Sequence, residues 1–251
     1  MSLYARGSSL LSLGKTAWMS VGTASGDTPV SRLTNGIMAQ WVQAEEQTAA
    51  FAVDLGSAMV PDLVAVFNHN VNPVADVFIE GATDAAFAAN VVTIAATVTT
   101  PHFWVDLRGT GASRRYWRLR VDGNTVAVRV GDLMVVQAET LRTHLWNYKD
   151  TKAYPEVGSV NDFGVLSRVK LGFAVRSREL TFTGDRTMVA QLRSIFRAMG
   201  LGPGPCVFVP VDGETDVWLL QSVETFPVEW EADGRYNVAI RFDEQSPGGG
   251  A

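Results

Sequence analysis

The sequence predicts a mainly β protein, with a jelly-roll sandwich in its first half and a smaller β-sandwich domain carrying one amphipathic helix in its second half. Two observations support this prediction. Short apolar runs of strand length recur along the chain and are mostly closed by turn-forming residues. A single stretch in the second half has the period of an amphipathic helix. With 251 residues, the chain is long enough for one large domain or two modest ones.

Strand-like runs fill the first half of the chain. In the run 116–121, large apolar residues alternate with arginines, which is the pattern of a strand with one buried face. Trp117 falls on the apolar side of this strand, so we expect it in the core. Further strands are expected at 51–56, 63–67, 75–81, 126–131 and 133–136, the last two as a closing pair.

A change in composition near Asn147 predicts a domain boundary, because a polar segment with proline and glycine begins there. We therefore divide the chain into a first domain at 1–145, a linker at 146–164 and a second domain at 165–245. The Gly-rich residues 246–251 are expected to form a disordered tail.

One helix is expected in the second domain, from Asp185 to Met199. Asp185 or Thr187 is placed to cap its first turn, and Gly200 follows its end. The apolar stripe consists of Met188, Leu192, Ile195, Phe196 and Met199. Strands are expected at 169–175, 179–183, 206–209, 217–220 and 236–242.

The composition limits the classes of partner. Apolar residues make up 47% of the chain and charged residues 19%, which is typical of a globular protein and argues against disorder. The formal net charge of −5 gives no general attraction to nucleic acids or anionic membranes. No apolar stretch is long enough to cross a bilayer, and we expect no signal peptide. We therefore expect neither a nucleic-acid partner nor membrane insertion.

The residues that carry most enzyme chemistry are scattered. The three histidines, His69, His102 and His144, are far apart in sequence. The single cysteine, Cys206, is expected to be a small buried residue of a strand. No phosphate-binding or nucleophile motif is present. We therefore expect no catalytic residue, no cofactor and no metal site, and we predict that the chain is not an enzyme. A hydrolase built on a sandwich is the least favoured hypothesis.

Three side chains are candidate contacts for a ligand or partner: Trp104, Arg114 and Arg115. A tryptophan on a loop can stack on a sugar ring, and two adjacent arginines before a strand can bind an acidic partner. The alternative is that the tryptophan belongs to the core and that the arginines are solvated.

Several segments of the first half resemble the galactose-binding-like, or discoidin-like, jelly-roll family. The run 51–56 and the following 63–70 are similar to a hairpin of that family, 115–121 is similar to a late core strand, and 33–36 is similar to an early asparagine–glycine loop. The resemblance implies a jelly roll. The sequence shows no clear counterpart of the calcium-site residues of some discoidin relatives, so the resemblance implies no metal site.

Over its whole length, the chain also resembles tailed-bacteriophage proteins that begin with such a jelly roll and carry a similar Asn-His-Asn turn, here within 66–70. The segment 168–244 resembles the β-sandwich-plus-helix module of tail-tube and distal tail proteins. This resemblance implies a virion structural protein of the tail tip or baseplate, assembled in the host cytoplasm, that contacts itself in a symmetric ring and binds other tail proteins. The alternative is a carbohydrate-binding module that recognises host surface glycans.

Overall fold

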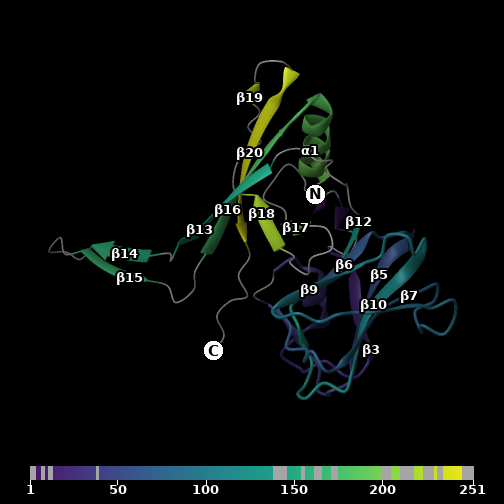
Figure 1. Ribbon diagram of the computed structural model, residues 1–251. Helices are drawn as coiled ribbons and strands as arrows, with labels where there is room; N and C mark the ends of the chain where they lie inside the picture. The colour runs from purple at the N-terminus through teal and green to yellow at the C-terminus, as the bar shows by residue number, and fades with distance from the viewer. Residues whose placement is uncertain are drawn as a thin grey trace.

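The fold is mainly β, with one α-helix in the part of the chain that is described, and this confirms the predicted fold class (Figure 1). The computed structural model describes residues 4–6, 9–10, 14–37, 40–137, 146–153, 156–160, 166–170, 175–198, 205–209, 218–222, 229–230 and 234–244.

The first half is a jelly-roll-like sandwich of two antiparallel sheets. One sheet has the strand order β3-β5-β10-β7-β8, and the other has the order β2-β12-β6-β9. A separate ladder joins β4 to β11, and a short 3-10 helix spans Val30–Thr34. The strands are β2 Ser9–Leu10, β3 Thr16–Val21, β4 Val42–Gln43, β5 Ala49–Met59, β6 Leu63–Phe67, β7 Asp76–Ala82, β8 Val92–Ala95, β9 His102–Asp106, β10 Arg114–Asp122, β11 Arg129–Val130 and β12 Asp132–Gln137.

The sandwich core is built by side-chain alternation along these strands. On β10, Trp117, Leu119 and Val121 point into the core and are almost fully buried, while the intervening residues face outward. Trp117 lies directly opposite Gly81 of β7. A Cβ atom at Gly81 would lie 2.9 Å from the Trp117 ring, so this position accepts only glycine without rearrangement. The expected core position of Trp117 is confirmed.

The expected closing pair of strands is wrong. β11 pairs with β4, whereas β12 pairs with β6 and β2, so these neighbours in sequence belong to different ladders. The turn around Gly131 carries the chain from one ladder into the other sheet, and its N–H donates to the carbonyls of Phe67 and Asn68. Adjacent apolar runs look like a hairpin in sequence, but a sandwich also places such runs in separate ladders.

The second half is built on a seven-stranded sheet with the order β1-β17-β18-β20-β16-β13, and β19 pairs with β20. Among the described residues this is one sheet with a helix beside it, not the expected second sandwich. The elements are β1 Tyr4–Arg6, β13 Trp146–Ala153, β16 Val175–Gly184, α1 Arg186–Ala198, β17 Pro205–Val209, β18 Trp218–Ser222, β19 Glu229–Trp230 and β20 Tyr236–Glu244.

Helix α1 begins as expected. The Asp185 carboxylate accepts the backbone N–H groups of Thr187 and Met188 at 2.9 and 3.0 Å, so Asp185 is the cap. Met188 and Leu192 are buried and Arg193 is exposed, which confirms the apolar stripe over these positions. The side chains of Ile195 and Phe196, together with Met199 and Gly200, lie outside the described residues.

The segment expected to be a linker, 146–164, contains strands. β13 pairs along its whole length with β16, and β14 Glu156–Val160 pairs with β15 Leu166–Lys170. Figure 1 shows the β14–β15 hairpin projecting away from the seven-stranded sheet. Pairing with a neighbouring strand outweighs the turn-like composition of this segment. The expected tail at 246–251 lies outside the described residues.

The two halves are joined by the N-terminal segment and by an apolar cluster. β1 pairs with β17 of the seven-stranded sheet, and β2 pairs with β12 of the sandwich, so these two successive strands belong to different sheets. Beside them, Leu63, Ala65, Phe67, Met134 and Val136 of the sandwich form one buried cluster with Val207 and Val209 of β17. The domain division at 145 remains a prediction, but β1 belongs to the sheet of the second half.

Candidate ligand-binding face

Trp104 lies in β9 and is half-buried against the apolar cluster between the two halves. The structure therefore places it at an internal contact, and it does not meet the two candidate arginines, which belong to β10 of the other sheet.

Arg114 and Arg115 both have partners within the chain. Arg114 donates from Nε to the carbonyl of Asn90 and from Nη1 to the carbonyl of Ser113, each at 2.8 Å. Arg115 forms a bidentate ion pair with Asp54, with both N–O distances 2.7 Å. This hydrogen bond from Arg115 is the main reason that the pKa of Asp54 is lowered.

Next to these arginines, the face of the five-stranded sheet that points away from the core carries a set of polar and aromatic side chains. We call it the outer face. The strand register aligns one row across all five strands. From β3 to β8 this row is Trp18, Ala52, Arg118, Glu80 and Thr93. The neighbouring row on β10 and β7 pairs Arg120 with Phe78, and the row on the other side pairs Tyr116 with Ala82.

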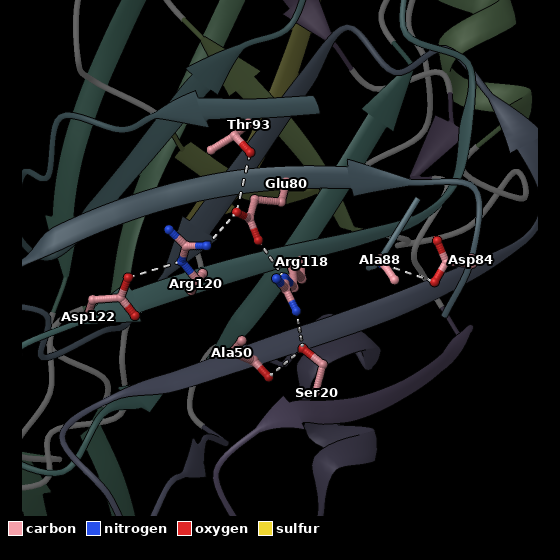
Figure 2. Close-up of polar contacts among 9 residues, drawn as sticks. All are labelled: Ser20, Ala50, Glu80, Asp84, Ala88, Thr93, Arg118, Arg120 and Asp122. Carbon is pink, nitrogen blue, oxygen red and sulfur yellow. Dashed lines mark hydrogen bonds and ion pairs between the residues drawn. The ribbon is translucent and has the colours of Figure 1, made fainter. Parts of the chain in front are cut away.

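A buried carboxylate is the centre of this face (Figure 2). The side chain of Glu80 is only 3% exposed, although it points away from the sandwich core. Its Oε2 accepts Arg118 Nε at 2.6 Å, and its Oε1 accepts Arg120 Nη1 at 2.8 Å and the Thr93 hydroxyl at 3.3 Å. Both carboxylate oxygens are therefore satisfied by charged or hydroxyl donors, as a buried charge requires.

The network continues to both sides of Glu80. Arg118 Nη1 donates to Ser20 Oγ at 3.2 Å, and the Ser20 hydroxyl donates to the Ala50 carbonyl at 3.5 Å. Arg120 Nε pairs with Asp122 at 3.0 Å. Figure 2 shows these contacts running from β3 across β10 to β7 and β8. The network thus holds two guanidinium planes in defined orientations on the sheet surface.

A loop folds over part of the outer face. Phe87, at the middle of the loop between β7 and β8, is buried beside Ala52 and Ala82, and the Arg118 guanidinium lies 4.1 Å from the centre of its ring. Its φ of 54° is unusual for a bulky residue. Asp84 holds the loop by accepting backbone N–H groups of Ala88 and its neighbours, and these bonds lower the pKa of its carboxyl.

Two aromatic rings stand beside this loop. Trp18 and Tyr116 are half-buried and lie edge to face, with ring centres 5.9 Å apart and an interplanar angle of 84°. The Arg115 guanidinium lies 5.0 Å from the Tyr116 ring. Aromatic side chains that keep part of their surface exposed and are fixed by their neighbours are typical of binding surfaces, because little side-chain entropy is lost on binding.

The Asn68-His69-Asn70 turn, by contrast, is structural. His69 is buried, its Nδ1 accepts the Val71 N–H at 3.2 Å, and its Nε2 therefore donates to the Thr99 carbonyl at 3.0 Å. Burial lowers the pKa of His69 to about 4, so the ring is neutral near pH 7. Asn70 joins two loops by bonding the Ala127 carbonyl and the Arg129 N–H.

A second buried carboxyl group, besides that of Glu80, lies next to the Asn68-His69-Asn70 turn and belongs to Asp132. Asp132 is fully buried, and its Oδ1 accepts the Gly36 N–H at 3.1 Å. Its Oδ2 has no hydrogen-bond partner among the described residues. Burial raises the pKa of Asp132 to about 7.

In the described ranges, no three histidine, cysteine or acidic side chains are placed to hold a metal ion together. Within the same ranges, no helix has the length and apolar character needed to cross a bilayer.

No protein-family model and no curated protein sequence matches the chain. Its N-terminal half resembles solved lectin and carbohydrate-binding domains. The lectin domain of lectinolysin, solved with Lewis b antigen, is 16% identical, covers 52% of this chain and 98% of its own, and has a TM-score of 0.43. A chitosan-binding module of a Paenibacillus sp. chitosanase/glucanase is 19% identical over 51% of this chain and 98% of its own, with a TM-score of 0.44. A Streptococcus pneumoniae fucose-binding module is 12% identical over 52% and 96%, also with a TM-score of 0.44. These are likenesses of fold.

Proposed function

We propose that the sandwich is a carbohydrate-binding module and that its ligand lies on the outer face of the five-stranded sheet. The observation that carries this proposal is the fixed pair of half-buried rings, Trp18 and Tyr116, next to the Arg118–Glu80 network. A sugar ring has apolar C–H surfaces that pack on aromatic rings, and hydroxyl groups that both donate and accept hydrogen bonds. The outer face offers surfaces of both kinds side by side.

The electrostatic balance of the outer face suits an uncharged ligand. Arg115, Arg118 and Arg120 each form an ion pair with a carboxylate of the same sheet. Charges that are paired in this way leave little net field to attract an anion. The solved structures with similar folds are described as lectin, chitosan-binding and fucose-binding domains, which agrees with the proposal, although that likeness concerns the fold alone. The proposed role is binding rather than catalysis.

A glycan array tests this proposal with the full chain and three variants. Trp18→Leu and Tyr116→Leu keep an apolar side chain but remove the rings, and Trp41→Leu is the matched control, because Trp41 packs beside Arg129 outside the outer face. We expect the wild type and the control to bind the same glycans, and each test variant to bind about tenfold more weakly or worse, as when an aromatic hot spot is truncated. Absence of wild-type binding would overturn the proposal, and loss of binding only in the Trp41 variant would overturn the location.

A second proposal is a structural role in a bacteriophage tail, at the tail tip or baseplate, through a ring of like chains and contacts with other tail proteins. Two features favour assembly. Among the described strands, β1 and β13 are the edges of the seven-stranded sheet, each paired on one side. The β14–β15 hairpin pairs only with itself there, and an isolated hairpin is marginally stable in water without a partner. Strands paired on one side only can pair with a strand of another chain.

Electron microscopy of purified virions, with antibody labelling of this chain, tests the structural role. We expect regularly spaced copies in the tail, with like chains in contact. Particles that lack the chain, or that contain only single separated copies, would contradict ring assembly and leave the carbohydrate-binding proposal untouched.

A further inference from the structure

The outer face carries a second aromatic position, on the far side of the Arg118–Glu80 network from Trp18 and Tyr116. Phe78 of β7 points outward and is half-buried. The Arg120 guanidinium lies 4.6 Å from the centre of the Phe78 ring. On the other side of Phe78, the paired residue of β8 is Ala95, which is small and exposed, so the ring is not covered from that strand.

The strand register separates the two aromatic positions. On β10, Tyr116 pairs with Ala82 and Arg120 pairs with Phe78, so the two rows lie four residues apart. At about 3.3 Å per residue, this separation is roughly 13 Å along the strand. A single pyranose ring is too small to contact both positions, whereas an extended chain of several sugars spans them.

The groups between the two aromatic positions are polar and paired. Glu80 is buried between Arg118 and Arg120, so the polar surface there comes from the Arg120 side chain, 30% exposed, and from the exposed Thr93 beside Glu80. Arg120 also pairs with Asp122, so the stretch has no excess charge for an anionic chain to bind. Donors between two aromatic platforms suit the hydroxyl groups of an uncharged polymer.

We propose that the outer face binds the interior of an extended, uncharged oligosaccharide, with one aromatic position at Trp18 and Tyr116 and a second at Phe78. The inference rests on the proposed carbohydrate-binding function and adds a ligand length to it. The affinity therefore rises with the number of linked sugars until the ligand contacts both aromatic positions. A monosaccharide contacts only one of these positions.

The test uses isothermal titration calorimetry on the full chain with one to six linked units of glucose, N-acetylglucosamine or mannose, all β-1,4-linked and all uncharged. For at least one series, we expect the affinity to rise at least tenfold from monosaccharide to tetrasaccharide. Phe78→Leu should lower the affinity for the tetrasaccharide to that of the shorter sugars and leave short-sugar affinity unchanged. Trp18→Leu should weaken binding at every length. Thermal unfolding of each variant checks that the fold is intact, and Phe78→Tyr, which keeps the ring, should restore the length dependence.

The outcomes separate the two proposals. Equal affinity for a monosaccharide and a tetrasaccharide, or an unchanged length dependence in a folded Phe78→Leu variant, would overturn the extended-ligand inference and leave sugar binding in place. If no series binds at millimolar concentration and the glycan array is also negative, both proposals are overturned. Array binding confined to single terminal or charged sugars would overturn this inference alone.

Discussion

The buried Asp132 carboxyl should make stability depend on pH in a way that its replacement by asparagine reveals. The pKa of Asp132 is about 7 in the fold against an ordinary value of 3.8, so folding favours the protonated form. Each pKa unit corresponds to about 1.36 kcal/mol, so about 4 kcal/mol of stability is present below pH 4 and is lost as the pH rises towards 7. Asparagine keeps the acceptor for the Gly36 N–H and cannot ionise.

His69 changes the free energy of unfolding in the opposite direction over the same pH range. Its pKa is about 4 in the fold against an ordinary value of 6.5, because the buried ring is held neutral. The unfolded chain binds a proton first as the pH falls, so about 3 kcal/mol is lost between pH 6.5 and 4. The two effects nearly cancel in the wild type. The free energy of unfolding of the Asp132→Asn variant should therefore fall by about 3 kcal/mol on acidification from pH 7 to 4. In the wild type, these two groups together should change it little.

Urea unfolding at half-unit steps from pH 4 to 8, with a chelator present, measures these profiles. The decisive quantity is the free energy of unfolding of Asp132→Asn minus that of the wild type, which should rise by about 4 kcal/mol from pH 4 to 8. Asp27→Asn, a change at an exposed carboxylate, is the control and should follow the wild-type profile. A difference between Asp132→Asn and wild type that stays constant with pH would refute the argument from burial.

Three further predictions concern packing. Leu192→Ala should lower the free energy of unfolding by about 2–5 kcal/mol because Leu192 is buried, whereas Arg193→Ala, at an exposed position, should change it little in urea titrations. Gly81→Ala should cost about 1–3 kcal/mol because its Cβ meets the Trp117 ring, and an unchanged free energy of unfolding would contradict this contact. Deletion of residues 1–12 should cost about 2–4 kcal/mol through the lost hydrogen bonds of β1 and β2, and an unchanged denaturation midpoint would contradict their role.

The strands of the sandwich were predictable where side-chain alternation or a dense apolar run is undisturbed. β6 coincides with the expected residues 63–67, and β10 extends the expected 116–121 at both ends. Helix α1 was predictable because its cap and its apolar stripe are both local signals. The pairing partners were not predictable from local pattern, since β1 meets β17 across about 200 residues of chain.

The candidate face was only partly visible in the sequence. The alternating arginines of β10 indicated one outward face, and Arg118 and Arg120 do lie on it. Glu80 was not singled out, because nothing local shows that two arginines of another strand and the Phe87 loop enclose it. Trp18 was not singled out, because the strand β3 that carries it was not expected. The roles proposed for Trp104, Arg114 and Arg115 remain untested, although all three have contacts within the chain.

The pairing of β1 with β17 has a consequence for synthesis on the ribosome. Tyr4 pairs with Val209, so the first strand leaves the exit tunnel long before its partner exists. At about 5–20 residues per second, roughly 10–40 seconds pass before β17 is made. Once Gln137 has been made, the sandwich has all of its described strands, while β1 still waits with an unpaired backbone. β1 therefore has no partner strand until β17 has been made, and this is the period in which a chaperone or a neighbouring nascent chain can bind it.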